Sequence, residues 1–260
     1  MNKPPKYVEG HKLLEGKTVL VTAAAGTGIG FATAIRCAEE GASGLMISDI
    51  HERRLGEAAE KIEQETGLRP DTVMCNVTNE DEVQAMFELA VEKMGHVDVL
   101  MNNAGLGGYA KLVDMTDDQW NLVLDVTLNG CFRCTRAALK HMMPRGTGTI
   151  VNNASVLGWR AQEGQSHYAA AKAGVMALTR CAAIEAAEHN VRINCVAPSL
   201  AMHPFLEKVT PPGLLEELKK REAFGRGAEP WEISNVMVFL GSEYSSYMTG
   251  EVLSVSSQRA

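Results

Sequence analysis

Short apolar runs alternate along the chain with longer segments in which apolar residues recur every three or four positions. Near-continuous apolar runs predict strands that are buried on both faces, and the longer periodic segments predict amphipathic helices. Strands that alternate with helices predict an α/β fold, built on a doubly wound, seven-stranded parallel sheet with helices on both faces. The predicted strands are residues 18–22, 44–49, 71–77, 97–105, 148–155, 191–198 and 251–256.

No linker or repeat interrupts this alternation, so the 260 residues are expected to form a single domain, with an N-terminal extension over residues 1–15. Long helices are expected at 117–142 and 167–188, where they would cover the sheet and also contact a neighbouring subunit. Residues 199–224 contain several prolines before a short amphipathic helix. That pattern predicts a mobile lid over a substrate site, although a surface excursion without function has the same composition.

Composition excludes several classes of protein. Hydrophobic residues make up 45% of the chain and charged residues 22%, which is ordinary for a soluble globular protein. The formal net charge is -7, and no cluster of Lys and Arg indicates a nucleic-acid partner. The first residues lack the apolar core of a signal peptide, and no stretch approaches the roughly 18 apolar residues of a membrane span. We therefore expect a cytoplasmic protein without a membrane or nucleic-acid partner.

The 6 cysteines are spread through predicted core elements, as reduced thiols of a cytosolic protein are. Cys131 and Cys134 form a CxxC pair, but no second pair at suitable spacing completes a zinc site. The pair lies inside a helical pattern, whereas a redox pair would lie at a strand-to-helix turn. Packing cysteines, and no metal site, are therefore expected.

The first predicted strand leads into a cluster of small residues, in the stretch TVLVTAAAGTGIGFATA over residues 18–34. Glycine lets the backbone approach a ligand, and the N-terminus of the following helix offers free N–H groups to a phosphate. An alanine stands where such a turn usually carries its first glycine, and the loop is one residue longer than usual. We expect a slightly expanded pyrophosphate-binding turn made by Gly26, Thr27, Gly28, Ile29 and Gly30.

Asp49 ends the second predicted strand, where its carboxylate can bind the adenosine ribose of NAD and would repel the 2′-phosphate of NADP. Arg53 and Arg54 follow closely and could contact that phosphate instead, but they begin a helix with the pattern of a solvated face. NAD is therefore the expected cofactor, with NADP as the alternative. Further cofactor contacts are expected where later strands end, from Asn76, Val77, Asn103, Ala104 and Gly105.

Tyr168 and Lys172 are four residues apart, so their side chains share one face of a helix. A free phenol holds its proton too tightly for efficient acid–base catalysis at neutral pH, and a nearby ammonium group favours the phenolate. Ser155 ends the fifth predicted strand, where its hydroxyl can polarise a substrate carbonyl. We expect these three residues to form the catalytic group, although each pattern by itself is common.

Taken together, these motifs resemble the short-chain dehydrogenase/reductase family over nearly the whole chain, because their order and spacing agree with it. The motifs are the glycine-rich turn, Asp49, NNAG at 102–105, Ser155, Tyr168, Lys172 and NCVAPS at 194–199. The resemblance implies a Rossmann-type sheet, a nicotinamide cofactor, and a homotetramer built through the two long helices and the C-terminal strand.

The resemblance also implies a role for each site residue. Tyr168 would act as general acid/base and Ser155 would orient the carbonyl. Lys172 would hold a cofactor ribose, so that Tyr168 and Lys172 both contact the cofactor, together with Pro198.

Several positions depart from the family pattern, among them Thr127, His203, Pro198-Ser199 in place of PG, and VSSQ in place of the usual C-terminal DGG. Thr127 stands where the family carries a catalytic asparagine, and Asn129 lies too far round the helix to replace it unless the helix bulges. Thr127 is therefore expected to hold the proton-relay water through its hydroxyl. His203 stands where the family carries a threonine that contacts the nicotinamide.

The phrases TAAAGTGIG, HERRLGE, NNASVLGWRAQ and AFGRGAEPWE resemble a bacterial subgroup of this family that is linked to steroid-ring catabolism. Members of that subgroup oxidise a ring hydroxyl of a bicyclic indane acid carried as a coenzyme A thioester. Arg160 and Lys208 would then meet coenzyme A phosphates, or else be ordinary surface charges. The residues expected to line the apolar substrate pocket are Leu106, Trp159, Met202, His203 and Phe205.

The expected function is NAD-dependent interconversion of a secondary alcohol and a ketone on such a thioester. Two alternatives remain open. One is a 3-oxoacyl thioester reductase that uses NADPH with acyl carrier protein or coenzyme A, and the other is a nucleotide-binding protein without catalysis.

Overall fold

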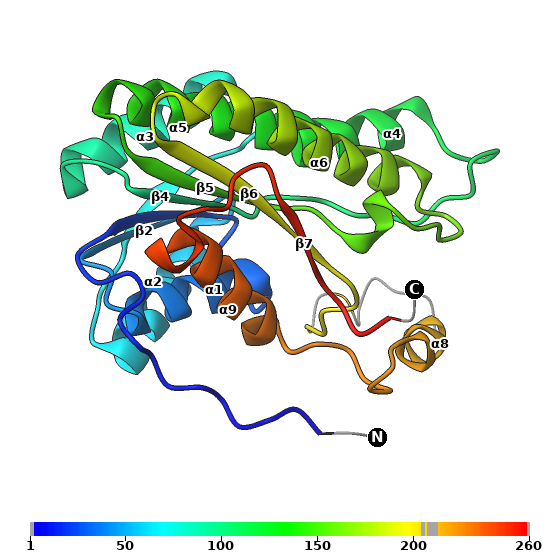
Figure 1. Cartoon of the computed structure of the whole chain (residues 1–260). Helices are drawn as coiled ribbons and strands as arrows, with labels where there is room; N and C mark the ends of the chain where they lie inside the picture. Colours follow the sequence, from blue (N-terminus) through cyan, green and yellow to red (C-terminus); the bar gives the residue numbers. More distant parts are fainter. Residues whose placement is uncertain (1–2, 204–205, 207–212, 259–260) are drawn as a thin grey trace.

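The computed structural model describes residues 3–203, 206 and 213–258, and its centre is a sheet of seven parallel strands. The strands are β1 (Thr18–Thr22), β2 (Gly44–Asp49), β3 (Asp71–Met74), β4 (Val99–Asn102), β5 (Gly148–Asn153), β6 (Val191–Pro198) and β7 (Val252–Val255). Their order across the sheet is β3-β2-β1-β4-β5-β6-β7 (Figure 1). The order reverses between β1 and β4, and ligands of such sheets bind beyond the carboxyl ends of the strands at this point.

Helices cover both faces of the sheet (Figure 1). One layer contains α1 (Ile29–Glu39), α2 (Glu52–Thr66) and α9 (Pro230–Gly241), and the other contains α3 (Glu80–Met94), α5 (Gly130–Arg145) and α6 (Ser166–Ala187). Helix α4 (Asp117–Leu124) runs into α5 through the π-helical turn η1 (Asp125–Asn129), and α8 (Leu214–Arg221) lies beyond β6. No helix among the described residues is long and apolar enough to cross a membrane.

Strand β1 illustrates why the sequence requires two covering layers. Val19 and Val21 pack in the core formed with α1 and α9, whereas Leu20 packs in the core formed with α3 and α5. All three side chains are fully buried. Because successive strand residues point to opposite faces, a strand that is apolar throughout is stable only between two layers. Burial of each such side chain is worth about 1.5–3 kcal/mol.

The predicted doubly wound sheet is confirmed, and the differences lie at the ends of elements. The predicted strand 71–77 ends at Met74, because the side chain of Asn76 accepts hydrogen bonds from the backbone N–H and hydroxyl of Thr78 and begins a turn. The predicted helix 117–142 extends to Arg145 and contains the π-helical turn.

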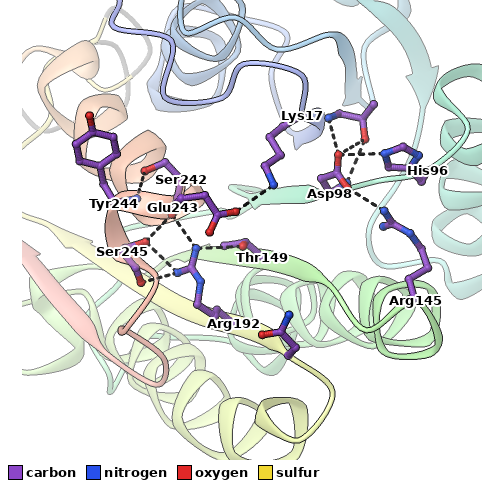
Figure 2. Close-up of polar contacts among 12 residues, drawn as sticks. Lys17, His96, Asp98, Arg145, Thr149, Arg192, Ser242, Glu243, Tyr244 and Ser245 are labelled. Carbon is purple, nitrogen blue, oxygen red and sulfur yellow. Dashed lines mark hydrogen bonds and ion pairs between the residues drawn. The ribbon is translucent and has the colours of Figure 1, made fainter.

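A polar cluster lies at the N-terminal ends of the strands and holds neighbouring elements together (Figure 2). Arg192 in β6 donates to the carbonyl of Ser242 at 2.8 Å, just beyond the end of α9. Asp98 accepts hydrogen bonds from the backbone N–H of Thr18 at 3.0 Å and from Arg145 at 2.9 Å. These contacts tie β6 to the end of α9, and β1 to β4 and α5, on the side opposite the carboxyl ends of the strands.

The predicted N-terminal extension lies along α1 and is anchored by a buried ion pair. The carboxylate of Glu40, which is fully buried, accepts hydrogen bonds from the backbone N–H groups of His11 and Leu13 at 2.8 and 2.9 Å. Arg36 pairs with Glu40 at 2.6 Å and donates to the carbonyl of Glu9 at 3.2 Å. Backbone groups of residues 9–13 form hydrogen bonds with both side chains of this buried ion pair. The segment before β1 is therefore fixed to the domain.

Candidate active site

The turn after β1 contains an alanine in the left-handed backbone region. Ala23 has a φ of 52°. Glycine enters this region freely, whereas other residues do so at a cost of about 1–2 kcal/mol. Ala23 stands where the sequence lacks the expected first glycine, so the turn follows the path of a glycine-led turn without that glycine. Helix α1 then begins at Ile29, with Gly28 as its N-cap and no side chain capping its first N–H groups.

Gly30 lies where no side chain fits. A Cβ built on Gly30 would lie 2.3 Å from the carbonyl oxygen of Ala23 and 2.4 Å from Nδ2 of Asn103. That amide nitrogen also donates to the carbonyls of Thr22 and Ala23, each at 3.2 Å. Close packing at Gly30 therefore brings the first turn of α1 against the carboxyl ends of β1 and β4.

Asp49 connects the carboxyl end of β2 with this turn. Its Oδ2 accepts a hydrogen bond from the N–H of Ala25 at 3.1 Å, and its Oδ1 accepts one from Ile50 at 2.8 Å. The residue is only half-buried, and this partial burial raises the pKa of its carboxyl group. Asp49 thus holds the long turn in place and still leaves part of its carboxylate accessible to a ribose hydroxyl.

Two asparagines connect the turn after β1 to Lys172 on α6. Nδ2 of Asn153, at the end of β5, donates to Oδ1 of Asn103 at 2.9 Å. The backbone N–H of Asn103 donates to the hydroxyl of Thr22 at 2.9 Å. The carbonyl of Asn153 accepts a hydrogen bond from Nζ of Lys172 at 2.5 Å. A chain of hydrogen bonds therefore runs from β1 through β4 and β5 to α6.

The three residues predicted to be catalytic lie together. Helix α6 places Nζ of Lys172, which is buried, 5.5 Å from the centroid of the Tyr168 ring. Ser155 follows β5, and its Oγ accepts a hydrogen bond from the N–H of Leu157 at 3.2 Å, which caps the short helix η2 (Val156–Gly158). All three side chains line one cavity. The structure thus brings a phenol, an ammonium group and a hydroxyl to one place, as acid–base chemistry on a carbonyl requires.

Thr127 reaches the same region through the π-helical turn. It is buried, and its hydroxyl donates to the carbonyl of Leu106 at 3.1 Å and accepts from the N–H of Leu106 at 2.9 Å. One acceptor lone pair is left for a water molecule, so the relay role of Thr127 stays a prediction. Asn129 is exposed and donates to Asp125, so it does not take the place of Thr127 even with the bulge.

The cavity has a volume of about 460 Å³ and extends from the turn after β1 to α8. Val156 and Leu157 contribute apolar surface beside Ser155, and Leu214 and Leu218 contribute it from α8. No described residue of the lining is an aspartate or glutamate. The part of the cavity beside Ser155 and α8 therefore suits the uncharged, mainly apolar body of a ligand.

The predicted cofactor residues fall into two groups. Those that line the cavity are Gly28, Ile29, Gly30, Asn103, Gly105, Tyr168, Lys172 and Pro198. Among the others, Gly26 and Thr27 lie in the turn itself, Asn76 is exposed, and Ala104 donates its N–H to Thr22 at 3.0 Å. Val77 is buried against Gly130, where a Cβ would lie 2.6 Å from its Cγ2, so only its backbone is left for an adenine.

Of the predicted substrate residues that the structure describes, only His203 lines the cavity. Met202 packs against Gly227, where a Cβ would lie 2.6 Å from its Cγ. Trp159 is 51% exposed and Leu106 is half-buried, and neither belongs to the lining. Phe205 and Lys208 lie outside the described residues.

Sequence reasoning missed the glutamines of the lining, which are Gln162, Gln165 and Gln258. Gln165 donates to the carbonyl of Gly108 at 2.6 Å. Gln162 and Gln165 follow Ser155 closely in the chain, so the loop between Ser155 and Tyr168 was a signal that could have revealed them. Gln258 lies far from both in sequence, in the VSSQ segment that departs from the family pattern, and that departure was the signal for it.

The CxxC cysteines pack in the core, as expected. Cys131 and Cys134 are buried, and burial raises the pKa of the Cys131 thiol to about 12. Within the part of the chain that the structure describes, no group of three or more His, Cys, Asp or Glu side chains could hold a metal ion.

Comparisons with known proteins place this chain among related enzymes. A family described as enoyl-(acyl carrier protein) reductase matches residues 23–257. The (5R,7aS)-5-hydroxy-7a-methyl-1-oxo-2,3,5,6,7,7a-hexahydro-1H-indene-carboxyl-CoA reductase of Mycobacterium tuberculosis is 60% identical over 256 residues, which cover 98% of this chain and 97% of the relative. A 3-oxoacyl-acyl-carrier-protein reductase of Thermotoga maritima is 40% identical, over 93% of this chain and 97% of the relative.

Solved structures agree with these similarities. A short chain dehydrogenase from Mycobacterium smegmatis is 57% identical, with a TM-score of 0.88 over 99% of both chains. An NAD⁺-bound xylitol dehydrogenase is 30% identical, with a TM-score of 0.88 over 94% of this chain and 99% of the other. The fold is therefore shared with dehydrogenases over nearly the whole chain.

Proposed function

The chain belongs to the short-chain dehydrogenase/reductase family and is an oxidoreductase that interconverts secondary alcohols and ketones; on that premise we propose that it uses NAD and acts on a bicyclic ring alcohol carried as a coenzyme A thioester. The observation that carries this proposal is the single cavity in which Ser155, Tyr168 and Lys172 meet the uncapped N-terminus of α1. That arrangement supplies both the phosphate-binding and the acid–base parts of a dehydrogenase.

The residues present fit a nicotinamide dinucleotide. The free N–H groups at the start of α1 would hold its pyrophosphate, Asp49 its adenosine ribose, and Lys172 its second ribose. When bound, the nicotinamide would supply the acceptor or donor of a hydride. The absence of a side chain at Gly30 leaves the backbone of α1 close to the strand ends, as such binding requires.

Proton transfer would be the task of Tyr168. In the direction of oxidation, its phenolate accepts the hydroxyl proton of the substrate, while the hydroxyl of Ser155 donates to the same substrate oxygen and holds it in place. The ammonium group of Lys172, 5.5 Å from the ring centroid, stabilises the negative phenolate. In the direction of reduction the same groups act in reverse, with the Tyr168 hydroxyl as proton donor.

Preference for NAD over NADP follows from Asp49. Its carboxylate lies at the end of β2 and would bind ribose hydroxyls, and its negative charge would repel a 2′-phosphate. Arg53 is paired with Glu57 at 2.5 Å, so its charge is already compensated on the helix surface. These contacts support NAD as the cofactor.

The cavity supports an uncharged ring as the reacting part of the substrate. Its described lining is largely apolar and contains no acidic side chain. The name of the Mycobacterium tuberculosis relative gives a bicyclic carboxyl-CoA whose ring system carries both a hydroxyl and an oxo group. We extend that class to this chain and propose that the substrate arises in steroid-ring degradation.

A substrate and cofactor assay tests the proposal. Purified enzyme is expected to oxidise a bicyclic hydroxyacyl-CoA with NAD, with absorbance of NADH as the readout. Tyr168→Phe should lower kcat/KM by about 10²–10⁴-fold, because the proton acceptor is lost, while NADH affinity changes less than about twofold. Unchanged turnover in this variant would contradict the mechanism.

The same assay separates the alternatives. The 40% identity to a 3-oxoacyl-acyl-carrier-protein reductase favours a 3-oxoacyl reductase as the second candidate. Strong preference for NADPH and for 3-oxoacyl thioesters would support that candidate. Binding of NADH without turnover of any thioester would indicate a nucleotide-binding protein instead.

We further propose a cytoplasmic homotetramer in which α5, α6 and β7 form the contacts between subunits. Phe132 on α5 and Ile184 on α6 are 41% and 80% exposed, and a shallow, largely apolar groove of about 660 Å³ lies between the two helices. Of the expected lid over 199–224, α8 lines the cavity through Leu214 and Leu218, which supports a lid role for that helix.

A further inference from the structure

The segment after β7 returns to the catalytic cavity. After β7, the described chain continues to Gln258, whose half-buried side chain lines the same cavity as Ser155 and Tyr168. Gln258 is far from both catalytic residues in sequence, and the proposed proton transfer does not use it. Its position therefore points to the substrate rather than to the chemical step.

The backbone of this tail is fixed to the end of α8. The N–H of Ala223 donates to the carbonyl of Ser257 at 2.6 Å, and the hydroxyl of Ser257 donates to the buried carboxylate of Glu222 at 2.7 Å. The N–H of Gln258 donates to Oγ of Ser256 at 3.0 Å. These bonds keep residue 258 in one place at the wall of the cavity.

The side chain of Gln258 is oriented by Arg160. Nη1 of Arg160 donates to Oε1 of Gln258 at 2.5 Å. A guanidinium group only donates hydrogen bonds, so its partner must be the amide oxygen, and the amide nitrogen must point the other way. No residue in the described ranges accepts a hydrogen bond from that nitrogen, and none forms an ion pair with Arg160. The amide NH₂ is thus a fixed donor for a ligand.

We propose that Gln258 is a specificity-determining residue whose amide NH₂ donates to a second carbonyl oxygen of the substrate, away from the reacting carbon, and that Arg160 is its positioning residue. The proposal rests on the proposed function, in which the ring system carries both a hydroxyl and an oxo group. The second carbonyl can only accept hydrogen bonds, and in this cavity Gln258 offers a donor whose own oxygen is already occupied. A substrate without that carbonyl would leave the donor unpaired, which disfavours it.

The test compares two bicyclic hydroxyacyl-CoA thioesters that differ only in the second ring ketone, with NAD as cofactor. In Gln258→Glu, the carboxylate keeps the bond to Arg160 but has no N–H to donate. We expect kcat/KM for the ketone-bearing thioester to fall about three- to tenfold, and that for the thioester without the ketone to change less than about twofold. An equal fall with both thioesters, or no fall with either, would overturn the proposal.

Variants of Arg160 test its positioning role. Arg160→Met should lose the same preference for the ketone-bearing thioester, whereas Arg160→Lys should keep part of it because an ammonium group still donates to the amide oxygen. Full preference in Arg160→Met would remove Arg160 from the proposal. Gln64→Glu, an exposed change of the same kind on α2, is the matched control and should alter neither rate.

The wild-type enzyme separates this inference from the function on which it rests. If it oxidises neither thioester, the proposed function fails and the inference fails with it. If it oxidises both equally well, the proposed function stands and the role of Gln258 is wrong.

Discussion

The carbonyl group of Ala23 lies against the Cα of Gly30, so the size of residue 30 sets how closely α1 approaches β1. Ala23 holds its carbonyl there with a left-handed φ of 52°. The neighbouring atoms belong to the backbone of the turn and to an amide that is itself bonded to two carbonyls, so neither moves away easily. Residue 30 therefore tolerates no added atom, although the turn tolerates an alanine at its start.

Gly30→Ala should consequently damage both stability and cofactor binding. The added methyl group must displace the Ala23 carbonyl or Asn103, which is expected to cost about 1–3 kcal/mol of the free energy of unfolding. Because the first N–H groups of α1 move with it, NADH affinity should fall about tenfold or more. Urea unfolding and fluorescence titration with NADH measure the two effects.

Gly26→Ala is the matched control in the same turn. No atom lies within 4 Å of a Cβ built on Gly26, so this variant should unfold like the wild type. If both variants lost stability and NADH affinity equally, the flexibility of the loop, rather than close packing at Gly30, would determine the shape of the turn.

At the scale of elements, the π-helical turn η1 is the feature that brings Thr127 to the site. Its buried hydroxyl makes two hydrogen bonds to the backbone of Leu106, which follows the NNAG segment after β4. The turn therefore joins the α4–α5 helix to the loop beside Lys172, since a Cβ on Gly105 would lie 3.7 Å from the Thr127 hydroxyl and 3.2 Å from Nζ of Lys172.

Thr127→Val should disconnect these elements while keeping the shape of the side chain. The N–H and carbonyl of Leu106 would lose their partner in a buried place, which is expected to lower the free energy of unfolding by about 1–3 kcal/mol. Thr127→Ser keeps the hydroxyl and should retain most of that stability. If Val and Ser variants unfold alike in urea, the hydroxyl does not join the two elements.

Asp98 connects β1, β4 and α5 at the opposite edge of the sheet, and its charge makes that connection depend on pH (Figure 2). Burial opposes the charged form, but the hydrogen bonds from Arg145 and Thr18 outweigh it and lower the pKa of the Asp98 carboxyl. A carboxyl with a lowered pKa in the folded state stabilises the fold above its unfolded pKa of about 3.9, and that contribution is lost as pH falls through the folded value.

Asp98→Asn should therefore reduce stability at neutral pH by about 1–3 kcal/mol, and the difference from the wild type should shrink as pH falls below about 4. Urea unfolding at a series of pH values gives both curves. If the difference in the free energy of unfolding stayed constant to the lowest pH measured, the charge of Asp98 would not contribute to stability.

Much of this architecture could be predicted because burial on two faces leaves a plain pattern. The predicted bounds of β1, β2 and β6 agree with the structure, since each strand is marked by a run of buried, mostly apolar residues. The end of β3 was wrong because a side-chain hydrogen bond at Asn76 begins a turn within an apolar run. The π-helical turn was missed as well, because its residues keep the apolar spacing of an ordinary helix.

The site was predictable where its residues are close in sequence. Tyr168 and Lys172 share one helix, and their nearness follows from four residues of spacing. The contact between Arg160 and Gln258 joins a loop after β5 to the end of the chain, so only the folded sheet brings them together. Met202 was expected in the pocket, but it packs on Gly227 because a glycine there leaves room for its side chain.

At the scale of the whole molecule, the exposed apolar residues of α5 and α6 are the basis for proposing an assembly. Ile184 is 80% exposed on α6, and the neighbouring groove is largely apolar. Exposed apolar surface of this kind often marks a contact between proteins.

Ile184→Asp should shift the proposed tetramer toward smaller species, because a carboxylate would be buried without a partner at the contact. Sedimentation velocity at several protein concentrations measures the distribution. Val113→Asp, at a position that is 91% exposed in the loop before α4, is the control and should leave it unchanged. A monomeric wild type would contradict the assembly itself.

The parallel sheet places the polar cluster of Figure 2 and the cavity at opposite ends of its strands. Arg192 and Asp98 hold strands and helices together where the strands begin, whereas Ser155 and Pro198 lie where strands end. Changes of the cavity wall should therefore seldom disturb the contacts that keep the protein folded. For directed evolution toward other alcohols, this separation offers a cavity wall that can be randomised broadly while most variants remain able to fold.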